Sequence, residues 1–295
     1  MVFNEECQLR FYDLPLCRLH VLEAGDGPPL IIVPATISEC RGWIPLMLFM
    51  AHWFHVYFFE LPGHGESSPF NQPFTTDLVS ETVKQLVDAL GIEHFSVMGF
   101  SFGGILAMKT YKHLSDRVDN VIMLSPCLTH RAILLSQARI WLVLAFNRII
   151  NQPRVRRAFL RLLHNPRTVT FGFRLLQRIG RIESTIDLRP RLLSLSESTL
   201  EVLGRQINEI MTISFVDPKE RHSTPCFLWM SVNDPVLDFE KTLDVMQAHF
   251  ANLEVVRADV PYHQSPEPLT YEGLNREYYE TVGGFLKGEK GVRNG

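Results

Sequence analysis

The sequence predicts an α/β protein in which helices cover both faces of a mostly parallel sheet of the eight-stranded type. Short apolar runs alternate with amphipathic segments of helix length, some of those runs are apolar at every position, and one long all-helical segment interrupts the alternation. A strand that is apolar on both faces belongs inside a sheet covered on both sides. The chain has 295 residues, 46% of them hydrophobic and 21% charged, which suits one large soluble domain with an insertion.

The alternating elements follow one another from the first strand to the last helix. Residues 30–33 and 55–59 are continuous apolar runs typical of buried strands, whereas residues 78–90 repeat apolar side chains with the helical period. We expect strands at 8–12, 17–23, 30–33, 55–59, 94–98, 121–124, 226–230 and 253–256. We expect the intervening helices at 43–53, 78–90, 105–111, 239–250 and 274–286.

The pattern changes to helices alone from about residue 130 to residue 205. Strand and helix alternate again after this segment, so we interpret it as an insertion into one core domain. The core domain is expected to consist of residues 1–128 and 218–288. A helical, Arg-rich cap is expected at 129–217 and a flexible tail at 289–295.

The cysteines and the first residues predict a reduced, cytoplasmic protein. No C-x-x-C spacing occurs and no histidines have metal-ligand spacing, so we expect no disulfide framework and no metal site. The N-terminus lacks the apolar core of a secretory signal. Residues 132–150 are the most apolar stretch, but polar residues interrupt them, and a membrane-spanning helix needs about 20 mostly apolar residues. The cysteines are Cys7, Cys17, Cys40, Cys127 and Cys226.

Ser101 stands between an expected strand, residues 94–98, and an expected helix, residues 105–111. Gly99 and Gly103 provide the small residues that a sharp strand-to-helix turn needs two positions before and after the serine. Such a turn exposes the serine hydroxyl and places N–H groups of the helix start beside it, where they can stabilise an oxyanion. The alternative is an ordinary Gly-Ser loop, which the flanking strand and helix disfavour.

A serine nucleophile needs a base to take its proton and a carboxylate to orient that base. In this topology the two partners follow the serine in the order acid, then histidine, each after a later strand. Asp234 follows the seventh expected strand and His263 follows the eighth, so we assign them these roles. Asp238 is the nearest rival for the acid and Asp244 a weaker one. A turn aspartate and a solvated loop histidine are the alternatives without function.

These motifs resemble the α/β-hydrolase family over nearly the whole chain. Residues 60–67, ELPGHGES, are similar to the loop D-x-P-G-x-G-x-S that follows the family's fourth strand, with Glu60 in place of the usual aspartate. The resemblance implies a hydrolase without a cofactor. Epoxide hydrolases and haloalkane dehalogenases of this family have aspartate where this chain has Ser101, so these two activities are disfavoured.

The resemblance also implies two oxyanion donors, the backbone N–H groups of Phe102 and Thr36. Phe102 directly follows the serine, and Thr36 aligns with the donor position in the loop after the third strand. The family usually has His-Gly before that donor, whereas this chain has Pro34 and Ala35. Proline has no N–H and alanine is less permissive than glycine. Because one oxyanion donor is typically worth about 10²–10³ in rate, this change bears on the efficiency of the site.

The sequence therefore predicts a serine hydrolase that cleaves a small hydrophobic carboxylic ester through an acyl-enzyme. We expect Phe100, Trp43 and Trp229 to line the acyl pocket together with the apolar side of the cap, because aromatic walls favour an apolar substrate. Hydrolysis of amides, thioesters or carbon–carbon bonds reuses the same triad and stays open. A ligand receptor or scaffold on the same fold, with little turnover, is the alternative from another class.

The cap has an unusual charge for a protein whose net charge is −3. From His130 to Arg191 there are 13 arginines, no lysine and two acidic residues, which gives this segment a net charge of +11. One interpretation is that its basic faces pair with the acidic core or meet water. The other is attraction to an anionic lipid surface or an anionic substrate. A nucleic acid partner is not expected, because no binding motif is present.

Overall fold

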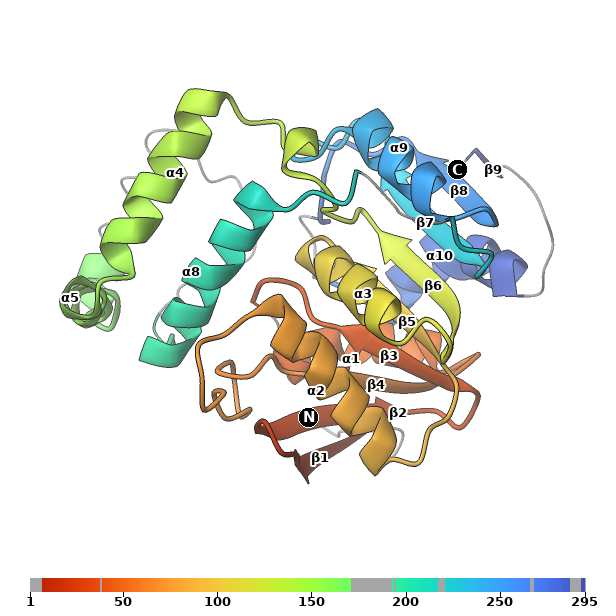
Figure 1. Ribbon diagram of the computed structural model, residues 1–295, viewed down its shortest axis with the longest axis horizontal. Coiled ribbons are helices and arrows are strands. Elements are labelled where there is room, and N and C mark those ends of the chain that lie inside the picture. The colour runs from red at the N-terminus through yellow and green to blue at the C-terminus, as the bar shows by residue number, and fades with distance from the viewer. Residues whose placement is uncertain are drawn as a thin grey trace.

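A nine-stranded sheet forms the middle layer of the molecule, with the strand order β1-β2-β4-β3-β5-β6-β7-β8-β9 (Figure 1). The first two strands pair antiparallel, β1 with β2 and β2 with β4, and all other pairings are parallel. The predicted α/β class with a mostly parallel sheet is confirmed. The computed structural model describes residues 7–37, 39–170, 193, 195–216, 221–265, 268–286 and 293–294.

The observed elements follow the predicted alternation. The strands are β1 (Cys7–Asp13), β2 (Arg18–Ala24), β3 (Pro29–Val33), β4 (His55–Phe59), β5 (Phe95–Phe100), β6 (Val118–Leu124), β7 (Cys226–Ser231), β8 (Leu253–Ala258) and β9 (Arg293–Asn294). The core helices are α1 (Cys40–Met50), α2 (Thr76–Ala89), α3 (Phe102–His113), α9 (Phe239–His249) and α10 (Tyr271–Leu286).

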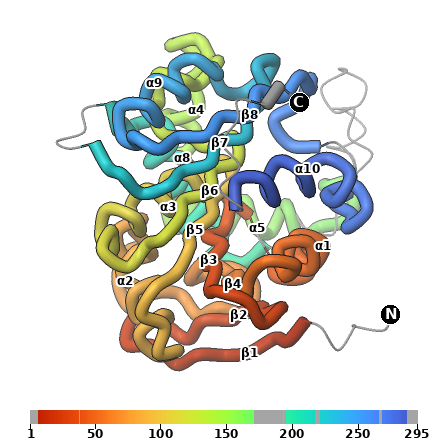
Figure 2. Tube along the Cα trace, turned by 90° about the vertical axis from the view of Figure 1, so that its right-hand side faces the viewer, coloured from red at the N-terminus to blue at the C-terminus, as the bar shows by residue number. Residues whose placement is uncertain are grey.

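The core helices form two layers, one on each face of the sheet (Figure 2). Helices α2, α3 and α9 bury their apolar sides on one face, and helices α1 and α10 bury theirs on the other. Strand residues alternate between these two hydrophobic cores: Val97 of β5 belongs to the first and Met98 to the second. Both faces of the central strands are therefore covered, which explains why these strands are apolar at successive positions.

Several element boundaries differ from the sequence prediction, by up to three residues. Helix α1 begins at Cys40 and ends at Met50, whereas the apolar pattern indicated 43–53. The apolar residues continue beyond the helix because Trp53 packs edge-on against Phe49 at a ring distance of 5.2 Å. Within the predicted tail, β9 pairs in parallel with β8, while the remaining tail residues lie outside the described part of the chain.

The segment predicted as a cap, residues 129–217 and called the cap below, leaves and rejoins the core at adjacent positions, since Thr129 pairs with Ser214 across an antiparallel bridge. Its described elements are a 3-10 turn (His130–Ala132), α4 (Gln137–Ile150), α5 (Pro153–Leu163) and α8 (Glu197–Thr212). Figure 1 shows α8 between α4 and the core, with α5 at the end of α4. None of the helices in the described ranges combines the length and the apolar content that a bilayer-spanning segment requires. Residues 171–192, within the predicted cap, lie outside the described residues.

Candidate active site

Ser101 lies in a sharp turn between β5 and α3. Its φ is +53°, in the left-handed region that side chains rarely adopt, and its N–H donates to the carbonyl of Leu124 at 3.1 Å. A Cβ atom at Gly99 would overlap the carbonyl of Gly103, so both flanking glycines are required by close backbone approach. The turn therefore holds Ser101 at the carboxyl end of the central strand.

Ser101, His263 and Asp234 form one hydrogen-bonded chain. The Oγ atom of Ser101 lies 2.8 Å from Nε2 of His263, and Nδ1 of His263 lies 2.6 Å from Oδ2 of Asp234. The side chain of Asp234 is fully buried and that of His263 is 13% exposed. The three residues come from loops after β5, β7 and β8, which meet at one edge of the parallel sheet. The folded chain thus brings together the three side chains singled out from the sequence.

Backbone donors keep the Asp234 side chain ionised and fixed. Its second oxygen, Oδ1, accepts the N–H groups of Val236 at 2.8 Å and Leu237 at 3.0 Å. Burial alone would raise the pKa of Asp234, but the hydrogen bonds from His263 and these N–H groups outweigh it and lower the pKa. The carboxylate can therefore accept a hydrogen bond from the Nδ1–H group of the imidazole and stabilise a positive charge on the ring.

The two rival aspartates occupy other positions. Asp238 is the N-cap of α9, where its side chain accepts the N–H of Lys241 and pairs with the Lys241 ammonium at 3.1 Å. Asp244 lies on an exposed position of the same helix. Within the described structure, the carboxylate that contacts His263 is Asp234.

The two predicted oxyanion residues lie at adjacent segments of the fold. Phe102 is the first residue of α3, and the first N–H groups of a helix have no acceptor within the helix. Thr36 lies in the loop after β3, which approaches α3 closely: a Cβ atom at Gly103 would lie 2.9 Å from the carbonyl oxygen of Val33. The loop after β3 thus packs against the start of α3, and the oxyanion role of Thr36 stays a prediction.

An apolar cavity of about 530 Å³ adjoins the imidazole. Phe100, which packs against the His263 ring at 5.4 Å, lines the cavity together with Trp43 of α1 and Trp229 of β7. The three predicted pocket residues are therefore walls of one space. Its other walls include the apolar residues Leu46, Phe49, Met50, Met98, Ile122, Leu124, Leu269, Leu274 and Val282.

The described walls of this cavity come from the core and not from the cap. None of its described lining residues belongs to 129–217; they come from α1, α10, the central strands and the loop after β8. The cavity extends between the sheet and the pair α1 and α10, on the face opposite to α2 and α3. One pattern in the sequence indicates this wall of the cavity. Leu274, Tyr278 and Val282 recur at helical spacing, on the side of α10 that faces the cavity.

Residues 28–263 match the family model described as alpha/beta hydrolase fold. The chain belongs to this family. A pimeloyl-[acyl-carrier protein] methyl ester esterase of Nitrosomonas europaea is 25% identical over 119 residues, 40% of this chain and 45% of that protein. A Bacillus subtilis protein named as an uncharacterized carboxylesterase is 25% identical over 126 residues, 42% of each chain. The matches thus span less than half the length of these curated relatives.

Solved structures of hydrolases share the fold over nearly the whole chain. A putative lipase from Acinetobacter baumannii has a TM-score of 0.71 and 14% identity, covering 96% of this chain and 93% of its own. At this identity the likeness concerns the fold alone. Esterases and a putative lipase are therefore among the proteins that this alpha/beta hydrolase chain resembles.

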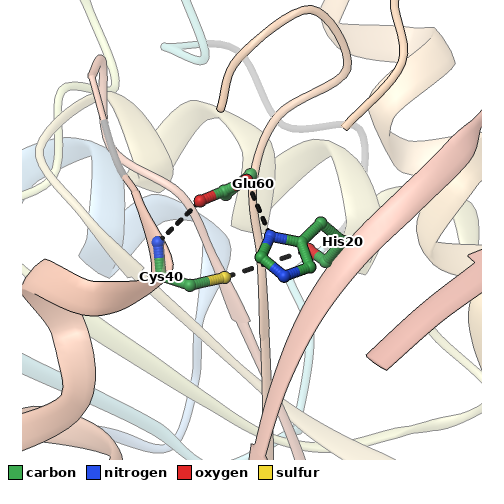
Figure 3. A group of neighbouring side chains, drawn as sticks. All are labelled: His20, Cys40 and Glu60. Carbon is green, nitrogen blue, oxygen red and sulfur yellow. Dashed lines mark hydrogen bonds and ion pairs between the residues drawn. The ribbon is translucent and has the colours of Figure 1, made fainter. Parts of the chain in front are cut away.

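In this alpha/beta hydrolase chain, Glu60 organises the loop after β4. Its carboxylate accepts the N–H groups of Cys40 at 3.0 Å and Glu66 at 2.7 Å, and lies 2.9 Å from Nδ1 of His20 (Figure 3). Gly65 has a φ of +50° and packs directly on this carboxylate, which leaves no room for a Cβ atom. Glutamate therefore shapes the loop in the place of the usual aspartate.

The cluster of His20, Cys40 and Glu60 has donor atoms within 4.8 Å of one another, so we tested it as a metal centre. Both Glu60 oxygens already accept hydrogen bonds. Burial and the neighbouring Glu60 raise the pKa of the Cys40 thiol, which keeps it protonated, whereas a metal ligand must be a thiolate. The donor set fits a structural hydrogen-bond network better than a metal site.

The same loop contacts the cap. The Gly63 carbonyl accepts hydrogen bonds from the hydroxyls of Ser198 at 3.1 Å and Thr199 at 3.0 Å, both on α8. The adjacent His64 is only 2% exposed, and burial lowers its pKa to about 4. A neutral histidine is therefore buried where core and cap meet.

Proposed function

We propose that this protein is a serine hydrolase that cleaves a hydrophobic carboxylic ester through an acyl-enzyme. The continuous hydrogen-bonded chain from Asp234 through His263 to Ser101 is the observation that carries the proposal. The family membership and the esterases among the similar proteins support the ester as the bond that is cleaved. In this arrangement Ser101 would act as the nucleophile, His263 as the base and Asp234 as the acid that orients the base.

The reaction would proceed in two halves. His263 takes the proton of Ser101 through Nε2 while Oγ attacks the ester carbonyl, and Asp234 stabilises the imidazolium through its bond to Nδ1. The tetrahedral intermediate expels the alcohol, which leaves with the proton from His263. Water then attacks the acyl-enzyme, again losing a proton to His263, and the carboxylic acid departs as Ser101 recovers its proton. The N–H groups of Phe102 and Thr36 are the proposed oxyanion donors.

The cavity suggests where the acyl chain lies. Its walls include Phe100 and His263, whose Nε2 atom lies 2.8 Å from the reacting hydroxyl, and many aromatic and aliphatic side chains. The charged residues Glu272, Arg276 and Glu277 also line it. Its volume of about 530 Å³ falls within the range of small-ligand pockets. An extended apolar acyl group would bury its surface there, gaining about 0.8 kcal/mol per methylene. We therefore propose a fatty acyl ester rather than an acetate ester as the preferred substrate.

Hydrolysis of p-nitrophenyl esters of increasing chain length tests the proposal. Wild type should turn over these esters, and both Ser101→Ala and His263→Ala should lower kcat by several orders of magnitude. Parallel panels of amides and thioesters identify the preferred bond. Folded wild type that turns over no compound in any panel would instead favour a ligand receptor on this fold, for which the Pro34-Ala35 segment is the observation in its favour.

A further inference from the structure

Helix α4 of the cap has a large apolar face that no described residue covers. On α4, Trp141 is 67% exposed, Leu142 58%, Phe146 61% and Ile149 53%. We call these four side chains the outer face of α4. Apolar residues are normally scattered singly over a surface, so four large ones on a single helix indicate a binding surface.

The inner side of α4 is fixed by polar contacts to α8. Asn147 is buried, and its Nδ2 group donates to the carbonyl of Gly204 and to Oδ1 of Asn208, both at 2.9 Å. These bonds set the rotation of α4 about its own axis, so that the opposite side faces away from the core. Figure 1 shows α8 between α4 and the core, so this side of α4 points away from the core.

Cations flank the outer face on both sides. At about 100° per residue, the outer face occupies an arc of about 140°, from Trp141 to Phe146, centred roughly opposite Asn147. Arg148 lies about 20° beyond one edge of the arc and Arg139 about 20° beyond the other. Both arginines are exposed. An apolar strip with basic residues along its edges is typical of a helix that lies in a membrane interface.

Most described arginines of the cap form no ion pair with another described residue, so their charge is available to a binding partner. Among ion pairs between described residues, Arg156 is the only arginine of 129–170 that takes part, and its partners Glu197 and Glu201 are themselves in the cap. The first interpretation was that the basic faces pair with the acidic core or meet water, and these described arginines, apart from Arg156, meet water. The exposed arginines are Arg131, Arg139, Arg148, Arg154, Arg157, Arg161 and Arg167.

We infer that the outer face of α4 docks onto an anionic lipid surface. The four apolar side chains would enter the boundary between headgroups and acyl chains, while Arg139 and Arg148 would remain at the headgroups. A helix of 14 residues is about 21 Å long, which suits a helix lying along the bilayer surface. Each arginine near such a surface strengthens binding by roughly fivefold.

Other occupants match this surface less well. A second copy docked through the same face by two-fold symmetry would bring the flanking arginines of both copies together, and like charges repel. An acidic protein would need an apolar patch of matching shape in addition to its charge. An anionic bilayer offers an apolar interior and negative headgroups at once, so both properties of α4 are satisfied.

Vesicle co-sedimentation of the full chain tests the inference. Binding to phosphatidylcholine–phosphatidylglycerol vesicles should exceed binding to pure phosphatidylcholine vesicles and should weaken as salt is added. Arg139→Gln with Arg148→Gln should weaken anionic binding on the order of 25-fold, and Trp141→Ser with Phe146→Ser should abolish it. The matched controls Leu9→Ser and Arg10→Gln, on the exposed strand β1, should bind as wild type does.

Tryptophan fluorescence identifies the inserted residue. Anionic vesicles should shift the wild-type emission to shorter wavelength, and Trp141→Phe should keep vesicle binding but lose the shift. Equal binding to neutral and anionic vesicles, or binding that the α4 variants leave unchanged, would overturn the inference. Oligomers or complexes with an acidic protein that depend on α4, without vesicle binding, would overturn it as well. Ser101→Ala should bind vesicles normally, so this inference and the hydrolase proposal fail separately.

Discussion

The hydroxyl of Ser231 donates a hydrogen bond of 2.5 Å to the backbone carbonyl of Val260. The same oxygen accepts the N–H groups of Val260 at 3.2 Å and Asn233 at 3.0 Å. Ser231 is fully buried at the end of β7. It thereby joins the loop that carries Asp234 to the loop that carries His263, and it was not recognised from the sequence.

Ser231→Ala should therefore lower kcat through misalignment of the acid and the base. Small displacements of catalytic groups cost up to about 10²-fold, so we expect a decrease of roughly ten- to hundredfold with little change in KM. Asn233→Ala is the matched control, because its bond to Asp259 joins the same two loops at an exposed position. Equal, small effects of the two variants on kcat would show that Ser231 does not position the site.

Asp234→Asn should lower kcat by about 10⁴ while the fold is kept, because an amide cannot hold the imidazole in the required tautomer. Asp238→Asn, four positions away, should leave kcat nearly unchanged. Both variants are compared by ester turnover and thermal unfolding. A large loss of kcat in Asp238→Asn, with Asp234→Asn active, would reverse the assignment of the acid.

Val282→Phe should shorten the preferred acyl chain. Val282 is 3% exposed and lines the cavity between α1 and α10, so a larger side chain there reduces the available volume. The ratio of kcat/KM for a dodecanoate ester to that for a butyrate ester should fall at least tenfold. Val232→Phe, at a 45% exposed position, serves as the control for the substitution itself. An unchanged ratio would place the acyl chain elsewhere, for example under the cap.

The free energy of unfolding should decrease as the pH is lowered from 6.5 to 4, because of His64. The pKa of His64 is about 4 in the folded chain, whereas an ordinary histidine, as in the unfolded chain, has a pKa of 6.5. Between these two pH values the unfolded state therefore binds a proton that the folded state does not bind. The loss should reach about 3 kcal/mol at pH 4 and level off below about pH 3, where both states bind the proton. Urea unfolding of wild type and His64→Phe checks this: the variant should lack this part of the pH dependence. Parallel pH curves for the two proteins would contradict the assignment.

The sequence was sufficient for features that depend on chain order. Ser101, Asp234 and His263 each follow a strand of a parallel sheet, and such strands deliver their loops to one edge, so local patterns placed all three residues. The oxyanion role of Thr36 stays a prediction, because the donor geometry of a loop depends on its backbone and the Pro34-Ala35 segment departs from the family pattern.

Features that depend on how helices pack could not be inferred in the same way. The cavity lies between α1 and α10, which are distant in sequence, and periodicity does not reveal whether their facing side chains fill the space between them. The predicted cap wall was inferred from chain order, whereas the described walls of this cavity come from the core. The basic charge of the cap was evident from composition, but the exposure of Trp141 and Phe146 depends on the rotation that Asn147 imposes on α4.

Labelling with a fluorophosphonate probe, followed by peptide mass spectrometry, tests the central claim most directly. The probe reacts with a serine only where a base activates its hydroxyl and an oxyanion site receives the phosphoryl oxygen. We expect one adduct on the peptide that contains Ser101, lost in Ser101→Ala and strongly reduced in His263→Ala. A folded wild-type protein that remains unlabelled, or an adduct on a different serine, would contradict the account.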